Sequence, residues 1–246
     1  MRKISSDEIT KYVKNNIQTF HSDRLRILEN TNLKDLLRKK NPYLFKAKNV
    51  TTAQELIESF LDAKLSSSEE EIFGNFLESL AIFVAGKTLR AVKSSTRGLD
   101  IEYTKGKTRY IMAIKSGINW GNSSQWQALE DNFKSANKVL RQSSHVSDVR
   151  CVLGISYGNA KSTIKRGLIH QIAGQEFWYM ISGSKSFYTD IVKPLGHRAK
   201  ALNDSFKEKK TKLINRLTKE FLTEFCDKGG NILWEEVVEF NSGNLE

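Results

Sequence analysis

Three ionisable side chains in the middle of the chain have the types and the order that phosphodiester hydrolysis requires. Asp100 opens an apolar segment, Lys115 closes the next one, and Glu78 precedes both. In such chemistry a divalent metal ion held by carboxylates neutralises phosphate charge, and a lysine orients the attacking water or stabilises the transition state. The bare pattern also fits ordinary solvated charges, so its meaning depends on the elements that carry it.

The local sequence predicts a hairpin that brings Asp100 and Lys115 together. The first strand covers about residues 99–103 and the second about residues 109–115, with a Lys/Gly turn between them. Alternation along the first strand places Asp100 and Glu102 on the same face. Glu78 reaches this point only if the helix that carries it packs across the sheet.

Helices and further strands are expected around this hairpin. Ser66 to Ser68, followed by three glutamates, predict a helix start, and a buried apolar stripe runs from Ile72 to Val84. The segment 149–156 is almost continuously apolar, which is typical of a central strand covered on both faces. The fold class is therefore α/β: a central mixed β-sheet of about five strands flanked by helices, with helical N- and C-terminal additions.

Composition limits the partners of the protein. The 246 residues carry a formal net charge of +11, and the isoelectric point is about 9.5, which favours a polyanionic partner. The sequence shows no apolar run of about 20 residues, so no membrane span is expected. Cys151 and Cys226 have no metal-binding spacing. We expect them to be reduced thiols in a cytoplasmic protein.

The order of motifs resembles a known family. An acid-bearing helix is followed by Gly-Leu-Asp-Ile-Glu (98–102), by a strand ending in Ile-Lys-Ser-Gly (114–117), and by Ile-Asn-Trp-Gly-Asn-Ser-Ser-Gln (118–125). This order resembles type II restriction endonucleases of the PD-(D/E)XK superfamily. The segments 154–159, 165–167 and 174–178 are also similar to the subgroup that cuts GG…CC-type interrupted palindromes. The resemblance extends from about Glu71 to Trp178.

The resemblance implies a function and a division of the chain. It implies Mg²⁺-dependent, sequence-specific cleavage of double-stranded DNA with 5′-phosphate and 3′-hydroxyl ends, in the cytoplasm of a prokaryote. A palindromic target fits a homodimer, and a methyltransferase of the same specificity is the implied genetic partner. We expect residues 1–65 to be a helical region for dimerisation or DNA wrapping, 66–182 the nuclease core, and 183–246 a helical region packed on it.

One position departs from the family pattern. By resemblance Asp100 is a metal ligand, Lys115 is the motif lysine and Glu78 is a helix carboxylate near the metal, but the second acid should stand where Ala113 does. An acid from elsewhere can replace it: Glu78, Glu102 or Glu130. Alternatively, the metal site uses Asp100, Glu78 and a backbone carbonyl near Ile114, or Ala113 is an engineered inactivation. We favour the first two explanations together.

Two polar segments are candidates for DNA contact. The loop after Lys115 combines glycines with amides and hydroxyls ahead of a helix N-terminus, which suits phosphate or base contacts. A capped helix explains the same residues without DNA. A short basic loop near residue 165 suits phosphate contact, with guanine recognition as a second option. The expected DNA-binding residues are Ser116, Asn119, Trp120, Asn122, Ser123, Gln125, Lys161, Lys165 and Arg166.

Two other functions remain open from the sequence. A catalytically inactive DNA-binding protein on a nuclease scaffold is consistent with Ala113, because a fold does not imply a function. A structure-selective repair nuclease would cut branched or damaged DNA without a fixed short sequence. Metal-dependent turnover would argue against an inactive DNA-binding protein. A reproducible fragment pattern would argue against a structure-selective repair nuclease.

Overall fold

The middle of the chain forms a mixed six-stranded sheet in the computed structural model, which describes residues 2–143 and 148–244. The strand order is β1-β2-β3-β4-β6-β5; β3, β4 and β6 run parallel, and the other neighbours are antiparallel. The expected α/β fold is confirmed, with one strand more than predicted. The strands are β1 (Val92–Lys93), β2 (Ile101–Lys105), β3 (Thr108–Lys115), β4 (Asp148–Ile155), β5 (Thr163–Lys165) and β6 (Ile169–Ala173).

The predicted hairpin is present as β2 and β3. Lys105 pairs with Thr108, which leaves a two-residue turn of Gly106 and Lys107. Gly106 has a φ of 63°, a conformation that glycine adopts without steric cost. The backbone N–H of Asp100, the residue before β2, donates to the Met112 carbonyl at 2.9 Å, which places Asp100 beside Met112 at the end of the hairpin.

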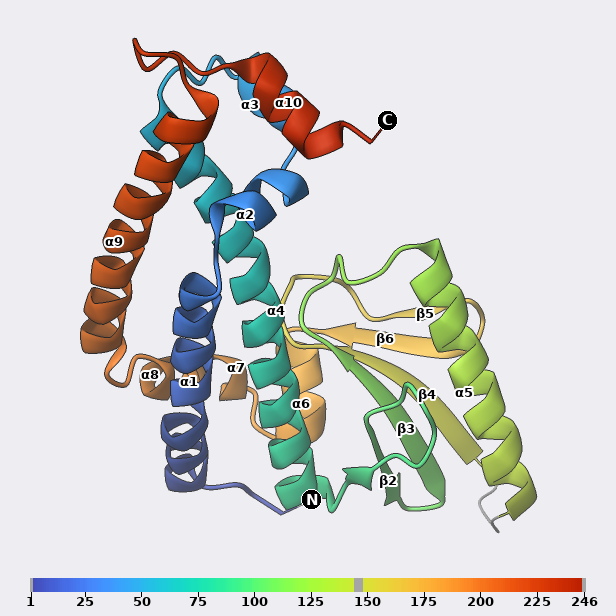
Figure 1. Ribbon diagram of the computed structural model, residues 1–246. Coiled ribbons are helices and arrows are strands. Elements are labelled where there is room, and N and C mark those ends of the chain that lie inside the picture. The colour runs from blue at the N-terminus through green and yellow to red at the C-terminus, as the bar shows by residue number, and fades with distance from the viewer. Residues whose placement is uncertain (1, 144–147, 245–246) are drawn as a thin grey trace. The chain divides into compact units, whose positions relative to one another are not determined.

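Helices cover both faces of the sheet (Figure 1). The helix α5 lies on one face, where its Leu129 and Phe133 belong to the same hydrophobic cluster as Ala113 and Leu153 of the strands. The helix α6 and the C-terminal part of α4 lie on the other face. The continuous apolar runs of β3 and β4 follow from this double cover. The helices around the sheet are α4 (Ala53–Leu89), α5 (Ser123–Ser143), α6 (Gln175–Ser182), α7 (Phe187–Asp190) and α8 (Val192–Leu195).

The predicted helix start at Ser66 to Ser68 is wrong. These serines lie inside α4, which runs without interruption from Ala53 to Leu89. Ser67 donates its hydroxyl to the Ala63 carbonyl at 3.1 Å, so the side chain is satisfied within the helix rather than at a cap. The buried residues Leu56, Phe60 and Leu61 supply the apolar face that continues the helix ahead of the serines.

The helix α4 is also, among the described residues, the one helix that is long and apolar enough to cross a membrane by length and composition. Core helices of soluble proteins meet the same criterion. Side chains such as Leu56 and Leu80 are fully buried within this protein. The helix therefore has a role in the protein core that accounts for its apolar character.

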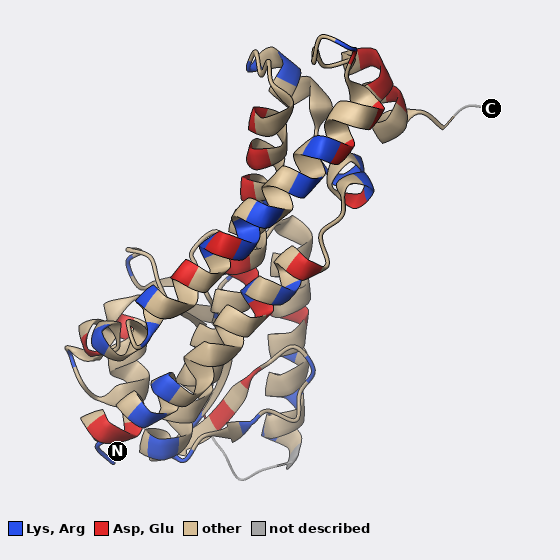
Figure 2. Ribbon diagram, turned by 60° about the vertical axis from the view of Figure 1, so that its left-hand side comes forward, with Lys and Arg blue, Asp and Glu red and all other residues tan. Residues whose placement is uncertain are grey.

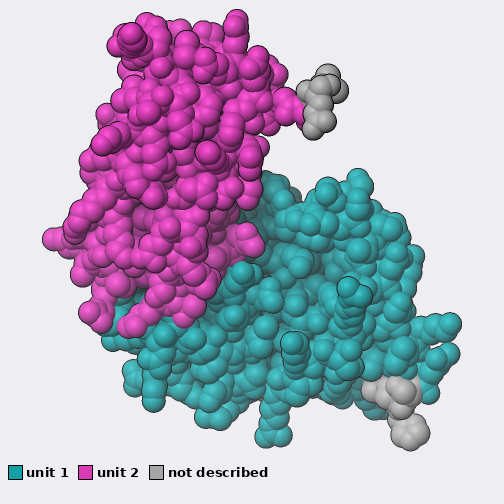
Figure 3. Space-filling model, viewed as in Figure 1, with its two compact units in different colours: residues 1–17, 73–197 teal, residues 18–72, 198–246 magenta. Residues whose placement is uncertain are grey.

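The described chain divides into two compact units (Figure 3). Residues 1–17 and 73–197 form the unit that contains the sheet, and residues 18–72 and 198–246 form a helical unit. This division differs from the three consecutive ranges expected from the sequence, whose roles stay predictions. The remaining helices are α1 (Ser6–Glu29), α2 (Leu33–Lys39), α3 (Pro42–Ala47), α9 (Ala199–Phe225) and α10 (Trp234–Ser242).

The helical unit has its own core and a charged outer helix. Leu36, Phe60, Leu217 and Phe221 are among the residues of its buried cluster. Figure 2 shows Lys and Arg distributed along α9, together with acids. Lys212 of this helix pairs with Glu208 at 2.6 Å, so part of the basic run is engaged within the unit.

Gly154 gives a direct test of the packing between β4 and α6. A Cβ atom at this position would lie 2.4 Å from the Phe177 ring, which is fully buried. We expect Gly154→Ala to lower the free energy of unfolding by about 1–3 kcal/mol, the usual cost of overpacking. The measurement is urea unfolding followed by circular dichroism.

Gly86→Ala is the matched control. Gly86 is an exposed position of α4, where a Cβ would meet nothing closer than 3.7 Å. We expect this variant to be more stable by up to about 1 kcal/mol, because alanine favours the helix. Equal effects of the two substitutions would contradict the described contact between β4 and α6.

Candidate active site

The carboxylate of Asp100 is fixed just before β2 begins. Its Oδ2 atom accepts a hydrogen bond of 2.6 Å from the backbone N–H of Ile114, and its own N–H donates to the Met112 carbonyl at 2.9 Å. Burial raises the pKa of Asp100 above its ordinary value, while the Ile114 N–H, Lys115 and Lys93 act in the opposite direction. The side chain is therefore a partly desolvated carboxylate attached directly to β3.

Glu78 approaches the same place from α4. Burial raises its pKa, the negative charge of Asp100 raises it further, and Lys115 lowers it. Gly74, one turn earlier in α4, allows a close approach to β3, since a Cβ there would lie 3.1 Å from the Ser116 side chain. The structure thus brings Glu78 into the electrostatic range of both Asp100 and Lys115.

Lys115 is the last residue of β3, and its ammonium is directed by an aromatic ring. Its Nζ lies 5.6 Å from the ring centroid of Trp120, a cation–π distance. Trp120 in turn contacts Trp126 of α5, with ring centroids 4.9 Å apart. Lys115 is therefore positioned both by the end of β3 and by the tryptophan pair at the start of α5.

The other two acids considered as replacements at Ala113 have partners elsewhere. Glu102 forms an ion pair of 3.0 Å with Arg109. Glu130 is 2.7 Å from Arg166 and 2.6 Å from Lys134. Ala113 itself is fully buried in the hydrophobic cluster under α5. Of the three candidates, Glu78 alone interacts electrostatically with both Asp100 and Lys115.

The loop after Lys115 ends in a capped helix. The Asn122 N–H donates to the Gln125 side chain at 2.9 Å, and the Gln125 N–H donates to the Asn122 side chain at 3.1 Å. This reciprocal pair caps α5 in the manner of a capping box. Asn119 and Ser123 are exposed. The amides of Asn122 and Gln125 thus have a structural role, and any contact with DNA would use their remaining atoms.

The segment after β4 packs directly against this loop. The Ser156 N–H donates to the Lys115 carbonyl and the Tyr157 N–H to the Ser116 carbonyl, both at 2.8 Å. Gly117 is needed here, because a Cβ would come within 2.7 Å of the Tyr157 ring. The segments that carry the subgroup resemblance therefore meet the end of β3, and Trp178 secures them with a 2.8 Å hydrogen bond to the Ser156 carbonyl.

The basic residues of the second candidate segment are exposed. Lys161 and Lys165 are open to solvent. Arg166 occupies a hairpin turn with Gly167, both with positive φ, and is held by Gln127 and Glu130 of α5. The structure does not bring these residues into the group formed by Asp100, Glu78 and Lys115.

Two contributors to the site were not predicted from the sequence. Lys93 acts on the Asp100 carboxylate from β1, a two-residue strand that carries no recognisable pattern. Trp120 was expected to contact DNA, but its contact with Lys115 was not foreseen. The indole Nε1 of Trp120 is buried and has no hydrogen-bond partner in the described part of the chain. Only the three-dimensional arrangement shows these two interactions.

Comparison with known families agrees with this arrangement. The family model described as Type II restriction endonuclease EcoO109I matches residues 7–203, which is most of the chain. The chain belongs to the family of the type II restriction endonuclease EcoO109I. A comparison with curated proteins finds no match. The match covers Glu78, Asp100 and Lys115 together with both candidate DNA-binding segments.

Membership of the EcoO109I family identifies the chain as a nuclease of the restriction endonuclease class, with DNA as the substrate class. The predicted resemblance to type II restriction endonucleases is thereby confirmed at the level of the family. The finer resemblance to enzymes of GG…CC specificity stays a prediction, because the match does not extend to a recognition sequence.

The raised pKa of Glu78 predicts a pH-dependent effect on stability. A carboxyl group whose pKa rises on folding stabilises the fold fully below its unfolded pKa and loses this contribution as pH rises through the folded value. Without metal, Glu78→Gln should therefore be more stable than the wild type at pH 8, by up to about 1 kcal/mol. The difference should vanish near pH 4, where the carboxyl is protonated.

Melting temperatures measured from pH 4 to pH 8 in EDTA check this prediction. Glu71→Gln, at an exposed position of the same helix, is the matched control for the effect of an amide substitution in α4. A Glu78→Gln variant that is less stable than the wild type at pH 8 would contradict the electrostatic description of the site.

Proposed function

We propose that the protein hydrolyses double-stranded DNA at specific sequences in a Mg²⁺-dependent reaction that leaves 5′-phosphate and 3′-hydroxyl ends. The observation that carries the proposal is the convergence of Asp100, Glu78 and Lys115 at the end of β3. This convergence occurs in a chain with a net charge of +11 that belongs to a restriction endonuclease family. Two acids and a lysine are the groups that metal-assisted phosphodiester hydrolysis uses.

The residues present fit a magnesium ion. Burial raises the pKa values of Glu78 and Asp100, the negative charge of Asp100 raises that of Glu78 further, and a divalent cation between them would relieve both effects. Among the described residues, no group of three or more His, Cys, Asp or Glu side chains is placed to hold a metal. Mg²⁺ needs no such group, because it retains waters and accepts substrate oxygens.

The backbone of β3 offers a further oxygen. The N–H and C=O groups of a strand residue point toward the same neighbouring strand. Because the Ile114 N–H points to Asp100, its carbonyl is directed to the same side, beyond the start of β2. We therefore assign Asp100, Glu78 and the Ile114 carbonyl as the ligands. A bound Mg²⁺ would supply charge neutralisation on the phosphate and activation of a water molecule.

The chain's own groups then complete the reaction. Water attacks the phosphorus and the bond from phosphorus to O3′ breaks; the leaving oxygen takes a proton from solvent, which gives the 3′-hydroxyl. Lys115, directed by Trp120, orients the water or stabilises the added negative charge of the transition state. Asp100 keeps its position through the Ile114 N–H as charge changes around it.

Glu78 takes the place of the acid that is missing at Ala113. This choice follows from the ion pairs that engage Glu102 with Arg109 and Glu130 with Arg166. A side chain at position 113 would be fully buried under α5. The small alanine fits this packing, while the carboxylate comes from α4 on the other side of the sheet.

Recognition of DNA is proposed for the two loops at the carboxyl ends of the strands. The loop 116–125 lies beside Lys115, and Lys161 and Lys165 add exposed positive charge. We propose a homodimer that reads an interrupted palindrome of the GG…CC type, protected in the host by a methyltransferase of the same specificity. The helical N-terminal region serves dimerisation or DNA wrapping in this proposal.

The proposal can be tested by digestion of long, sequenced, unmethylated DNA with and without Mg²⁺. We expect discrete, reproducible fragments only with Mg²⁺. Asp100→Asn and Lys115→Met should each slow cleavage by at least about 100-fold, because a metal ligand or a transition-state cation is lost. A fixed fragment pattern argues against a structure-selective repair nuclease, and specific retention of DNA without cleavage would indicate an inactive binding protein.

A second readout does not depend on cleavage. Mg²⁺ should raise the melting temperature of the wild type, since an ion that binds only the folded state stabilises it. Asp100→Asn should abolish this increase, and Glu102→Gln should retain it, because Glu102 pairs with Arg109 instead. An equal increase in all three proteins would rule out the assigned ligands.

Substitution of Ala113 distinguishes the explanations for the missing acid. If Glu78 supplies the carboxylate, Ala113→Glu should give no gain in cleavage. It should also lower stability by about 1–3 kcal/mol, because it overfills a fully buried position. Ala113→Gln is the uncharged control of equal size. A gain in cleavage with Glu but not with Gln would show that an acid at position 113 is the native arrangement.

A further inference from the structure

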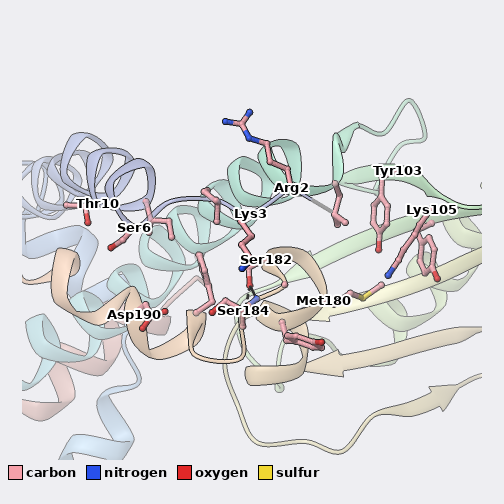
Figure 4. Close-up of a pocket in the computed structure, with 17 residues that line it drawn as sticks. Arg2, Lys3, Ser6, Thr10, Tyr103, Lys105, Met180, Ser182, Ser184 and Asp190 are labelled. Atoms are coloured by element: carbon pink, nitrogen blue, oxygen red, sulfur yellow. Dashed lines mark hydrogen bonds between the residues drawn. The ribbon is translucent and has the colours of Figure 1, made fainter.

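A cavity of about 800 Å³ lies in the sheet-containing unit, away from the candidate active site. It is formed by the N-terminal segment, the ends of β2 and β3, and α6 with the turn that follows it (Figure 4). Tyr103 lies three residues beyond Asp100 in the chain, which corresponds to about 10 Å of strand, and Asp100, Glu78 and Lys115 do not line the cavity. The cavity is therefore separate from the group that contains Asp100, Glu78 and Lys115.

Aromatic rings form one wall of this cavity. Tyr103 and Tyr110 stack with ring centroids 4.9 Å apart and an interplanar angle of 1°. Tyr179 of α6 also lines the cavity and is 48% exposed. Figure 4 shows the Tyr103 hydroxyl directed into the cavity, and burial raises its pKa, so it remains a hydrogen-bond donor. Flat aromatic surfaces of this kind favour stacking with a planar ring.

Positive charge is supplied to the same cavity from two elements. Lys3 comes from the N-terminal segment and Lys105 from the end of β2, and Figure 4 shows both directed inward. Neither forms an ion pair with a carboxylate in residues 2–143 or 148–244. A neighbouring recess is lined by Lys87, Arg90 and again Lys105. Asp190 also lines the cavity, so Lys3 and Lys105 together leave an excess of positive charge, which favours an anionic ligand.

The N-terminal segment that carries Lys3 is tied to the rest of the unit. The Arg2 N–H donates to the Thr88 carbonyl of α4 at 3.0 Å. Glu8 of α1 is 3.6 Å from Lys87, also in α4. These contacts hold Lys3 over the cavity, so the binding groups come from a defined arrangement rather than from a free end.

We propose that this cavity binds a nucleoside phosphate. The base stacks against the tyrosines, and the phosphate is held between Lys3 and Lys105. A small inorganic anion would leave the aromatic wall and most of the 800 Å³ unused, and an apolar ligand would leave two cations without partners. The ligand comes either from a free nucleotide or from the terminal nucleotide of a DNA strand. The proposal does not depend on the cleavage reaction.

Calorimetric titration of the full chain in EDTA with 2′-deoxyadenosine 5′-monophosphate tests the proposal. We expect one nucleotide bound per chain. Deoxyadenosine has the base without the phosphate, and inorganic phosphate has no base. Each should therefore bind at least about tenfold more weakly than the nucleotide. Absence of binding at millimolar nucleotide, or equal binding of inorganic phosphate, would overturn the proposal.

Matched variants locate the binding site. Lys105→Ala should weaken binding at least about tenfold, while Lys107→Ala, an exposed lysine of the same hairpin outside the cavity lining, should not. Tyr179→Ala should weaken binding about tenfold, and Tyr188→Ala should not. Both tyrosines are more than 40% exposed, so the fold tolerates their replacement. Wild-type affinity in both Lys105→Ala and Tyr179→Ala would overturn the proposal.

Two further experiments identify the source of the nucleotide and show whether the cavity and the Asp100 site bind independently. A duplex with a single-stranded 5′-phosphorylated end that competes with the nucleotide, while a hairpin-closed duplex does not, would identify a DNA end as the ligand. Competition by neither duplex would identify a free nucleotide. Asp100→Asn should leave nucleotide binding unchanged. The proposal for the cavity and the proposal for the cleavage reaction can therefore be disproved separately. Loss of binding in Asp100→Asn would place the nucleotide at the cleavage centre and overturn the proposal.

Discussion

The hydrogen bond between the Asp100 carboxylate and the Ile114 N–H is the constraint on which the site depends. It joins the residue before β2 to the end of β3 across 2.6 Å. The contact is possible because β2 begins only at Ile101, so the N–H of Ile114 has no backbone partner from that strand and donates to the Asp100 side chain instead. The same arrangement leaves the Ile114 carbonyl available and places Lys115 one residue further along.

The layers of the fold supply the remaining groups to this strand end. The helix α4 crosses the face opposite α5 and brings Glu78 to the end of β3, with Gly74 permitting the close approach. From the α5 side, Trp120 directs the Lys115 ammonium. Each group comes from a different element, and burial raises the pKa values of both carboxyl groups. The candidate site therefore holds two partly desolvated carboxyl groups and a lysine at one strand end.

The β2–β3 hairpin carries two kinds of chemistry at positions about 10 Å apart along the chain. At one end Asp100 takes part in the candidate metal site, and at the other the stacked pair of Tyr103 and Tyr110 lines the cavity. A single short hairpin thereby carries both the candidate metal site and the cavity proposed to bind a nucleotide.

The sequence by itself determined the fold class, the hairpin, the covered central strand and the family to which the chain belongs. These follow from local signals: apolar periodicity, turn residues and the spacing of Asp100 and Lys115. The continuous helix α4 was not predicted, because serines that fit a cap also fit a helix interior when their hydroxyls bond to a preceding carbonyl, as Ser67 does.

Only the tertiary structure decided which acid accompanies Asp100. From the sequence, Glu78, Glu102 and Glu130 were all possible sources of the missing acid, and the resemblance named Glu78 as a helix carboxylate near the metal. Which charges meet could not be predicted, because ion pairs form between residues far apart in the chain. The structure pairs Glu102 with Arg109 and Glu130 with the distant Arg166, and it leaves Glu78 beside Asp100. Spacing along a chain fixes neighbours within one element, whereas the packing of elements fixes which charges meet.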